Sequence, residues 1–170
     1  QLLRDSGDAV VLAAVCSPVE KQLLAQWCAE QRAADPRRDI TVLEVPNDEP
    51  GTETVARLVS RLEGDEDRIV LPLRVFWGGQ RHTSNRSRVV ELLTGRDPDR
   101  PSARRQRRIL AQDRSAARVV AGEPATIGEL RRQWRQTSAG AGEADFARFV
   151  ARRAILALER VEYRLLGPEY

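Results

Sequence analysis

The sequence predicts an α/β fold: a small, mostly parallel sheet with helices packed on it, followed by a helical C-terminal part. Three observations support this. Apolar runs of strand length alternate with amphipathic helical segments over the first eighty residues. The helical segments are long enough to serve as crossover connections, which make successive strands parallel. Toward the C-terminus helical periodicity dominates, and the 170 residues suit one domain, or one domain with an extension.

The first unit is a strand, a helix and a second strand. Residues 9–15 (AVVLAAV) form an apolar, partly β-branched run of strand length. Three agreeing signals then start a helix: Ser17 can cap it, Pro18 suits the first helical position, and Glu20 completes a capping box. This helix should end before Asp35, which precedes a proline. Its apolar face carries Val19, Leu23, Leu24 and Trp27.

The second unit repeats this pattern. Residues 40–45 (ITVLEV) predict a strand, residues 52–62 an amphipathic helix, and residues 68–77 (RIVLPLRVFW) the most strand-like segment of the chain. Pro72 lies within that last segment and has no main-chain N–H to donate. It therefore predicts either an edge position or a bulge at this point of the sheet.

The remaining elements are mainly helical. We expect an arginine-rich helix over residues 102–112, a short strand over 117–121, a helix from Thr126 through Trp134, and a long periodic helix over 143–166. Thr126 and Glu129 have the spacing of a capping box.

We divide the chain into an α/β domain of three or four strands, residues 1–121, and a helical extension, residues 122–170.

Composition excludes several classes of protein. No apolar run approaches the roughly 18 residues that cross a bilayer. All but one of the 28 basic residues are arginine, and the net charge of +3 is too small for a general nucleic-acid-coating role. Cys16 and Cys28 are too few for a disulfide scaffold or a zinc site, so we expect buried thiols in a reducing compartment. The sequence contains no methionine and no secretion signal, so it looks cut from a longer protein.

Two loops follow predicted parallel strands, where α/β sheets usually bind ligands. The first, around Ser17, has no glycines, so helix capping is a better interpretation than anion binding. The second follows Trp77 and contains two glycines, Arg81 and His82, which fits either an anion site or a solvated surface loop. His82 is the only histidine, and no acid/base pair, metal site or cofactor motif accompanies it.

The arginine-rich helix is the other candidate for function. On a helix, Arg104, Arg107 and Arg108 share one face. Such a face could contact anionic lipid headgroups, bind another protein or RNA phosphates, or simply be solvated or paired with carboxylates. RNA is the weakest of these, because the aromatic residues fall mostly on predicted core faces and leave no stacking platform. The residues alone therefore predict an α/β domain without a visible active site.

A resemblance extends this conclusion. Residues 69–78 (IVLPLRVFWG) resemble the strand that precedes the catalytic domain in bacterial glycerol-3-phosphate acyltransferases. The segments that follow occur in the same order as in that family. They are residues 117–126 (ARVVAGEPAT), 129–131 (ELR), 146–153 (FARFVARR) and 165–170 (LLGPEY).

The resemblance implies a parent enzyme that transfers an acyl group from acyl-CoA or acyl-carrier protein to the 1-hydroxyl of glycerol 3-phosphate. That family uses a histidine in an H-x-x-x-x-D motif as its general base, whereas Ser87 stands five places after His82 here. The chain thus resembles the non-catalytic N-terminal domain, which we expect to be inactive alone and to need no cofactor or metal.

The resemblance also implies a location and partners. The parent enzyme is expected at the cytoplasmic face of the bacterial inner membrane, as a peripheral protein. The expected partners of this domain are the catalytic domain of the same chain and the anionic membrane surface, which Arg104, Arg107 and Arg108 would contact; nucleic acid is not expected. The alternative is a free-standing anion- or protein-binding module, with an anion held beside Arg81.

Overall fold

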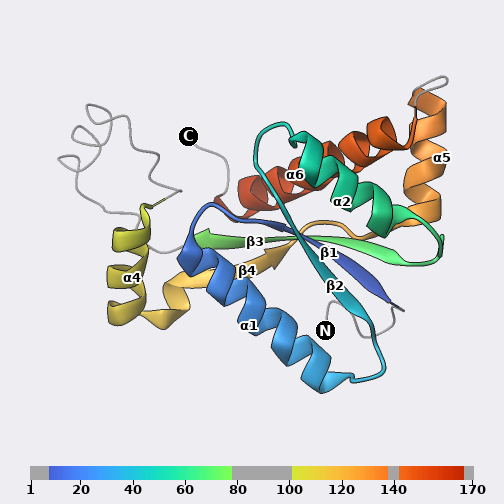
Figure 1. Ribbon diagram of the computed structural model, residues 1–170. Helices are drawn as coiled ribbons and strands as arrows, with labels where there is room; N and C mark the ends of the chain where they lie inside the picture. Colours follow the sequence, from blue (N-terminus) through green and yellow to red (C-terminus); the bar gives the residue numbers. More distant parts are fainter. Residues whose placement is uncertain (1–7, 78–100, 138–141, 167–170) are drawn as a thin grey trace, which may run out of the picture.

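The computed structural model describes residues 8–77, 101–137 and 142–166 (Figure 1). It confirms the predicted α/β class. Arg81 and His82, and with them the predicted loop after Trp77, lie outside the described residues. The elements in chain order are β1 (Ala9–Ala14), α1 (Pro18–Ala34), β2 (Ile40–Val45), α2 (Thr52–Leu62), β3 (Ile69–Trp77), α4 (Ala103–Gln112), a 3-10 turn (Arg114–Ala116), β4 (Ala117–Ala121), β5 (Ala125–Thr126), α5 (Ile127–Thr137) and α6 (Glu143–Leu166).

The sheet has the strand order β2-β1-β3-β4, with β5 also paired to β3. β1 is parallel to both β2 and β3, as the crossover helices require. β4 and β5 are antiparallel to β3. The sheet is therefore parallel at its centre and antiparallel at one side, which agrees with the expected mostly parallel arrangement.

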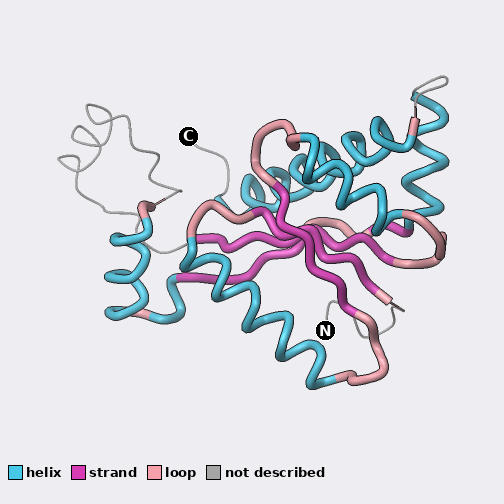
Figure 2. The backbone as a smooth tube through the Cα atoms, in the orientation of Figure 1, coloured by secondary structure: helices cyan, strands magenta, loops and turns pink. Residues whose placement is uncertain are grey.

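Helices cover both faces of the sheet (Figure 2). α1 lies on one face, whereas α2, α5 and α6 lie on the other, and α4 stands at the end where β3 terminates (Figure 1). Every residue of β1 is buried, and alternate residues point to opposite layers. Val10, Leu12 and Ala14 pack in the core shared with α2, α5 and α6, and Val11 packs against α1.

α6 contributes a continuous apolar stripe to the larger core. Phe146, Val150, Ala154 and Leu158 recur at a spacing of four residues, and each is at most 3% exposed. They pack with residues of β1 and α2, so residues from both sides of the expected 121/122 boundary share one core. The C-terminal helices consequently act as one layer of the sheet domain.

Pro72 does not lie at an edge, because β3 is the strand between β1 and β4. The edge expectation is therefore wrong, and the irregularity lies in the neighbouring strand instead. β4 ends at Ala121 and β5 begins at Ala125, and the pairing register with β3 changes by one residue between them. Pro72 faces this break, where its carbonyl accepts a hydrogen bond from Gly122 N–H at 2.9 Å. The missing N–H of Pro72 is tolerated because the partner strand is interrupted there.

Candidate functional site

The order of the strands defines where an α/β sheet usually binds a ligand. The chain moves from β1 to β2 on one side and to β3 on the other, so the switch point lies at the carboxyl ends of β1 and β3. Here, side chains of the chain itself occupy this switch point. The central one is Glu20, a carboxylate on the first turn of α1 that is only 4% exposed.

Glu20 occupies the place that a bound anion would take at the start of α1. Ser17 Oγ accepts a hydrogen bond from Glu20 N–H at 3.1 Å, which confirms Ser17 as the predicted cap. The carboxylate of Glu20 reaches back, and its Oε2 accepts from Cys16 N–H at 2.8 Å. Its Oε1 accepts from Trp77 Nε1 at 3.0 Å. A negative charge at a helix N-terminus is favourable, and here the chain supplies that charge itself.

Gln106 connects this buried carboxylate to α4. Its side-chain Nε2 donates to Glu20 Oε1 at 2.9 Å and to the carbonyl of Pro101 at 2.8 Å, while its Oε1 accepts from Ser17 Oγ. Gln106 is 1% exposed, and Ile109 on the same side of α4 is also buried. These contacts fix which face of α4 points inward and therefore which face meets solvent.

A second polar cluster lies near the same end of the sheet. Arg74 on β3 is 4% exposed, and it donates to Glu162 Oε2 on α6 at 2.8 Å and to Asn47 Oδ1 at 2.5 Å. Asn47 Nδ2 donates in turn to Cys16 Sγ at 2.6 Å. The cluster thus joins the ends of β1, β2 and β3 to α6. A buried arginine needs such partners, because an unpaired charge there would be strongly destabilising.

The two cysteines differ in their surroundings. Cys28 on α1 is buried, as expected, and this burial raises the pKa of its thiol. The positive charge of Arg32 partly opposes this effect. Cys16 is exposed, so the expectation that both thiols are buried is wrong for this residue. The physical reason is its position: Cys16 lies after the last residue of β1, in the turn that leads into α1.

Three arginines share the outer face of α4. Arg104, Arg107 and Arg108 are exposed, whereas Gln106 and Ile109 on the opposite face are buried. The ten residues of α4 include no carboxylate. Within the described parts of the chain, none of the three arginines forms a hydrogen bond or an ion pair. The structure therefore places these three predicted residues together on an open, basic surface.

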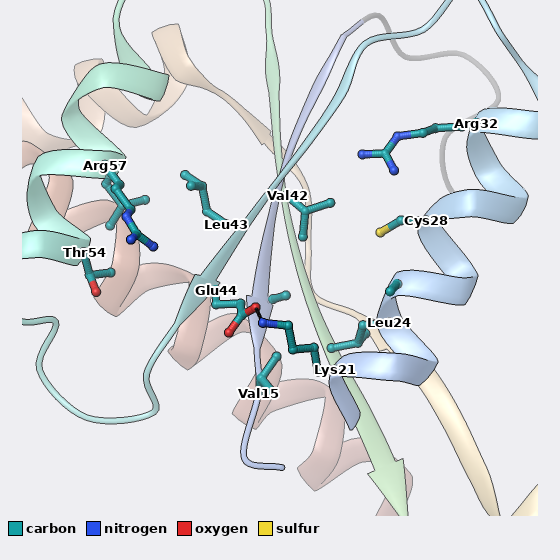
Figure 3. A pocket seen from close by; sticks show the side chains of 13 residues that line it. Val15, Lys21, Leu24, Cys28, Arg32, Val42, Leu43, Glu44, Thr54 and Arg57 are labelled. Atoms are coloured by element: carbon teal, nitrogen blue, oxygen red, sulfur yellow. Dashed lines mark ion pairs between the residues drawn. The ribbon is translucent and has the colours of Figure 1, made fainter. Parts of the chain in front are cut away.

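A groove of about 450 Å³ runs along β2 between α1 and α2 (Figure 3). Leu24 and Cys28 of α1 and Leu58 of α2 contribute apolar walls, and Val42 of β2 is 37% exposed within it. Lys21 of α1 and Glu44 of β2 form an ion pair across one end. Sequence reasoning missed this groove, because it depends on which strand ends the sheet.

Two further findings restrict the chemistry of the described residues. They contain no group of three or more histidine, cysteine, aspartate or glutamate side chains placed to hold a metal ion. Of the helices in the same segments, none combines the length and apolar character that a membrane crossing requires.

The fold and the site define a mostly parallel α/β domain whose carboxyl-edge crevice is closed by its own side chains. No family model matches this sequence, and the search of solved structures found no match to this chain.

Proposed function

We propose that this chain is the N-terminal structural and membrane-docking domain of a bacterial glycerol-3-phosphate 1-O-acyltransferase. In this proposal α4 contacts the anionic cytoplasmic face of the inner membrane through Arg104, Arg107 and Arg108. The observation that carries the docking role is the arrangement of α4. Its inner face is held by buried contacts, and its outer face presents three arginines that have no carboxylate partner among the described residues. The similarity of residues 69–78 and 117–170 to that enzyme family supports the choice of parent protein.

The alternative of a carboxylate-paired surface helix fits α4 poorly. Many other arginines of the described structure do have acidic partners, as in the pairs Arg38–Asp35, Arg57–Glu53, Arg74–Glu162, Arg131–Glu143 and Arg148–Asp145. Arg104, Arg107 and Arg108 differ from these because they have no acidic partner among the described residues, and α4 itself contains no carboxylate. Like charges on one face repel each other, so an anionic partner surface would stabilise this arrangement.

The size of the effect can be estimated. Each basic side chain close to an anionic membrane contributes about 1 kcal/mol, so three arginines supply about 3 kcal/mol, or about a hundredfold in membrane partition. This is enough for weak, reversible attachment and too little for permanent anchoring. It suits a domain that orients a catalytic domain of the same chain on the membrane surface.

The filled crevice supports a non-catalytic role for this segment. In the parent enzyme the acyl group would pass from acyl-CoA or acyl-carrier protein to the 1-hydroxyl of glycerol 3-phosphate, which forms lysophosphatidic acid. We assign that step to the catalytic domain, because the H-x-x-x-x-D motif is missing from this sequence. The 170-residue chain alone should therefore show no glycerol-3-phosphate-dependent release of CoA, and turnover by it would contradict this assignment.

Vesicle co-sedimentation tests the docking role. We expect the chain to bind vesicles rich in phosphatidylglycerol about a hundredfold more strongly than phosphatidylcholine vesicles, and to lose this preference when Arg104, Arg107 and Arg108 become glutamine. The matched control replaces three exposed arginines elsewhere, Arg132, Arg135 and Arg152, and lowers the net charge equally. Equal binding to both vesicle types, or an equal loss in the control variant, would refute docking through α4.

A further inference from the structure

The last turns of α6 extend beyond the hydrophobic core. Leu158 is the last residue of this helix that is buried, and residues 159–165 are half-buried or exposed. Leu165 follows Leu158 at heptad spacing, so it continues the apolar stripe that packs against the sheet earlier in the helix. Here the stripe meets solvent, and Leu165 is 49% exposed. Tyr163, on the other side of the helix, is 69% exposed. The end of α6 is therefore apolar on two opposite sides.

The same end of the helix carries a positive charge. Residues 163–166 (YRLL) include no carboxylate. The carboxylate just before them, Glu162, accepts a hydrogen bond from the buried Arg74 at 2.8 Å. Arg164 is exposed and has no acidic partner among the described residues. Exposed apolar side chains that flank a free cation are typical of helices that lie at an anionic lipid surface.

The contacts of α6 place this end at the carboxyl edge of the sheet. Glu162 bonds to Arg74, which lies three residues before β3 ends at Trp77. Figure 1 shows α6 running toward the end of the sheet to which β3 points, and α4 stands at that same end. The inner face of α4 is held against the sheet, so its outer face points away from it. One flat surface can therefore contact the outer face of α4 together with Tyr163 and Leu165.

We propose that the last turn of α6 inserts Tyr163 and Leu165 into the interfacial region of the membrane that α4 contacts. This inference rests on the proposed docking role and adds an apolar component to it. The side chain of Leu165 enters the boundary between headgroups and acyl chains, and the phenol of Tyr163 lies at the level of the headgroups with its hydroxyl in water. Arg164 pairs with a lipid phosphate. Charge on α4 and insertion by α6 are two weak signals that act together.

A lipid surface fits this end of α6 better than a protein partner does. A specific protein interface buries about 800 Å² on each partner, and one helical turn with two exposed apolar side chains supplies only a fraction of that area. A membrane has no such requirement, because each apolar side chain that leaves water contributes by itself. The cation between the two apolar side chains also matches an anionic bilayer in charge.

Co-sedimentation of the 170-residue chain with phosphatidylglycerol and with phosphatidylcholine vesicles tests the insertion. We expect Leu165→Ser to bind both vesicle types about fivefold more weakly, because one half-exposed leucine is no longer transferred out of water. Leu156→Ser is the matched control: Leu156 is 47% exposed on the same helix but lies about 14 Å further back along its axis. This control should bind as the parent does, and urea unfolding of both variants should match that of the parent.

The two vesicle types separate insertion from the charge of α4. Leu165→Ser should keep the preference for phosphatidylglycerol, whereas glutamine at the three α4 positions removes the preference and leaves binding to phosphatidylcholine unchanged. Equal binding by Leu165→Ser and Leu156→Ser would refute the insertion and leave docking through α4 standing. A preference that survives the α4 substitutions would refute that docking while the effect of Leu165→Ser remains. If Leu165→Ser instead abolishes self-association in sedimentation equilibrium and leaves vesicle binding unchanged, a second copy of the chain covers this end of α6 and the insertion is wrong.

Discussion

Replacing Gln106 by leucine should detach α4 or destabilise the whole domain, because this side chain holds the helix to the sheet. Leucine has a similar volume and forms none of the three hydrogen bonds that Gln106 makes with Glu20, Ser17 and the Pro101 carbonyl. A hydrogen bond to a charged group contributes about 1.5–3 kcal/mol and a neutral one about 0.5–1.5 kcal/mol. Ser17 can turn toward water and Glu20 keeps its bonds from Trp77 and Cys16, so we expect a net loss of about 3 kcal/mol.

Urea unfolding and amide exchange together measure this loss. If α4 stays docked, the free energy of unfolding falls by about 3 kcal/mol; if α4 detaches alone, the amides of Ala103–Gln112 exchange about a hundredfold faster while global stability changes less. Gln112→Leu is the matched control, since Gln112 ends the same helix and is exposed. Unfolding and exchange indistinguishable between the two variants would show that the buried hydrogen bonds of Gln106 do not hold α4.

Two further predictions concern the packing of α6. Gly122→Ala would place a methyl group 3.0 Å from Ala157 Cβ and 3.1 Å from Pro72 Cβ, and neither atom can rotate away. Urea unfolding should therefore show that the free energy of unfolding falls by about 1–3 kcal/mol. The control Gly51→Ala meets no atom within 4 Å and should cost less; the reverse order would contradict the packing argument. In the folded state Arg131 donates two hydrogen bonds to the carboxylate of Glu143, and this ion pair lowers the pKa of the Glu143 carboxyl. The substitution Glu143→Gln removes the ion pair. Glu143 therefore adds stability above the ordinary carboxyl pKa and loses it as pH falls through its lowered value. The Glu143 side chain is about half exposed, so the contribution of the ion pair is small. In thermal unfolding, the free energy of unfolding of the variant should be about 0.5 kcal/mol lower than that of the parent at pH 7 and equal to it in strong acid. A difference that does not change with pH would exclude the ion pair as its cause.

Local sequence signals predicted most of the fold. The helix at Pro18–Ala34 begins after Ser17 and ends before Pro36, as capping and proline chemistry require. Thr126 and Glu129 form the predicted reciprocal capping box, with hydrogen bonds of 3.0 and 3.1 Å. These predictions hold because each depends on residues at most four positions apart, so the interactions that stabilise the feature can be predicted from neighbouring residues in the sequence.

The buried polar contacts could not be read in this way. Gln106 and Glu20 are 86 positions apart, and Arg74 and Glu162 are 88 apart. In the sequence, Gln106 is one polar residue within an arginine-rich helix, and only its position against the sheet makes it a buried anchor. The two-residue β5 was missed for the same reason, since it depends on a neighbouring strand. Pro72 predicted an irregularity at this point of the sheet, but the sequence did not show that the extra residue lies in the neighbouring strand.

The face formed by Arg104, Arg107 and Arg108 was predicted from helical periodicity, but its orientation depends on Gln106. This dependence can be tested with the variant described above. If the order of α4 matters for docking, Gln106→Leu should weaken binding to anionic vesicles although all three arginines remain, because a loosened helix must be reordered at the membrane. A matching loss of global stability in urea unfolding would indicate general unfolding. Loss of vesicle binding with global stability retained would identify the buried contacts of Gln106 as the reason that the arginines face outward.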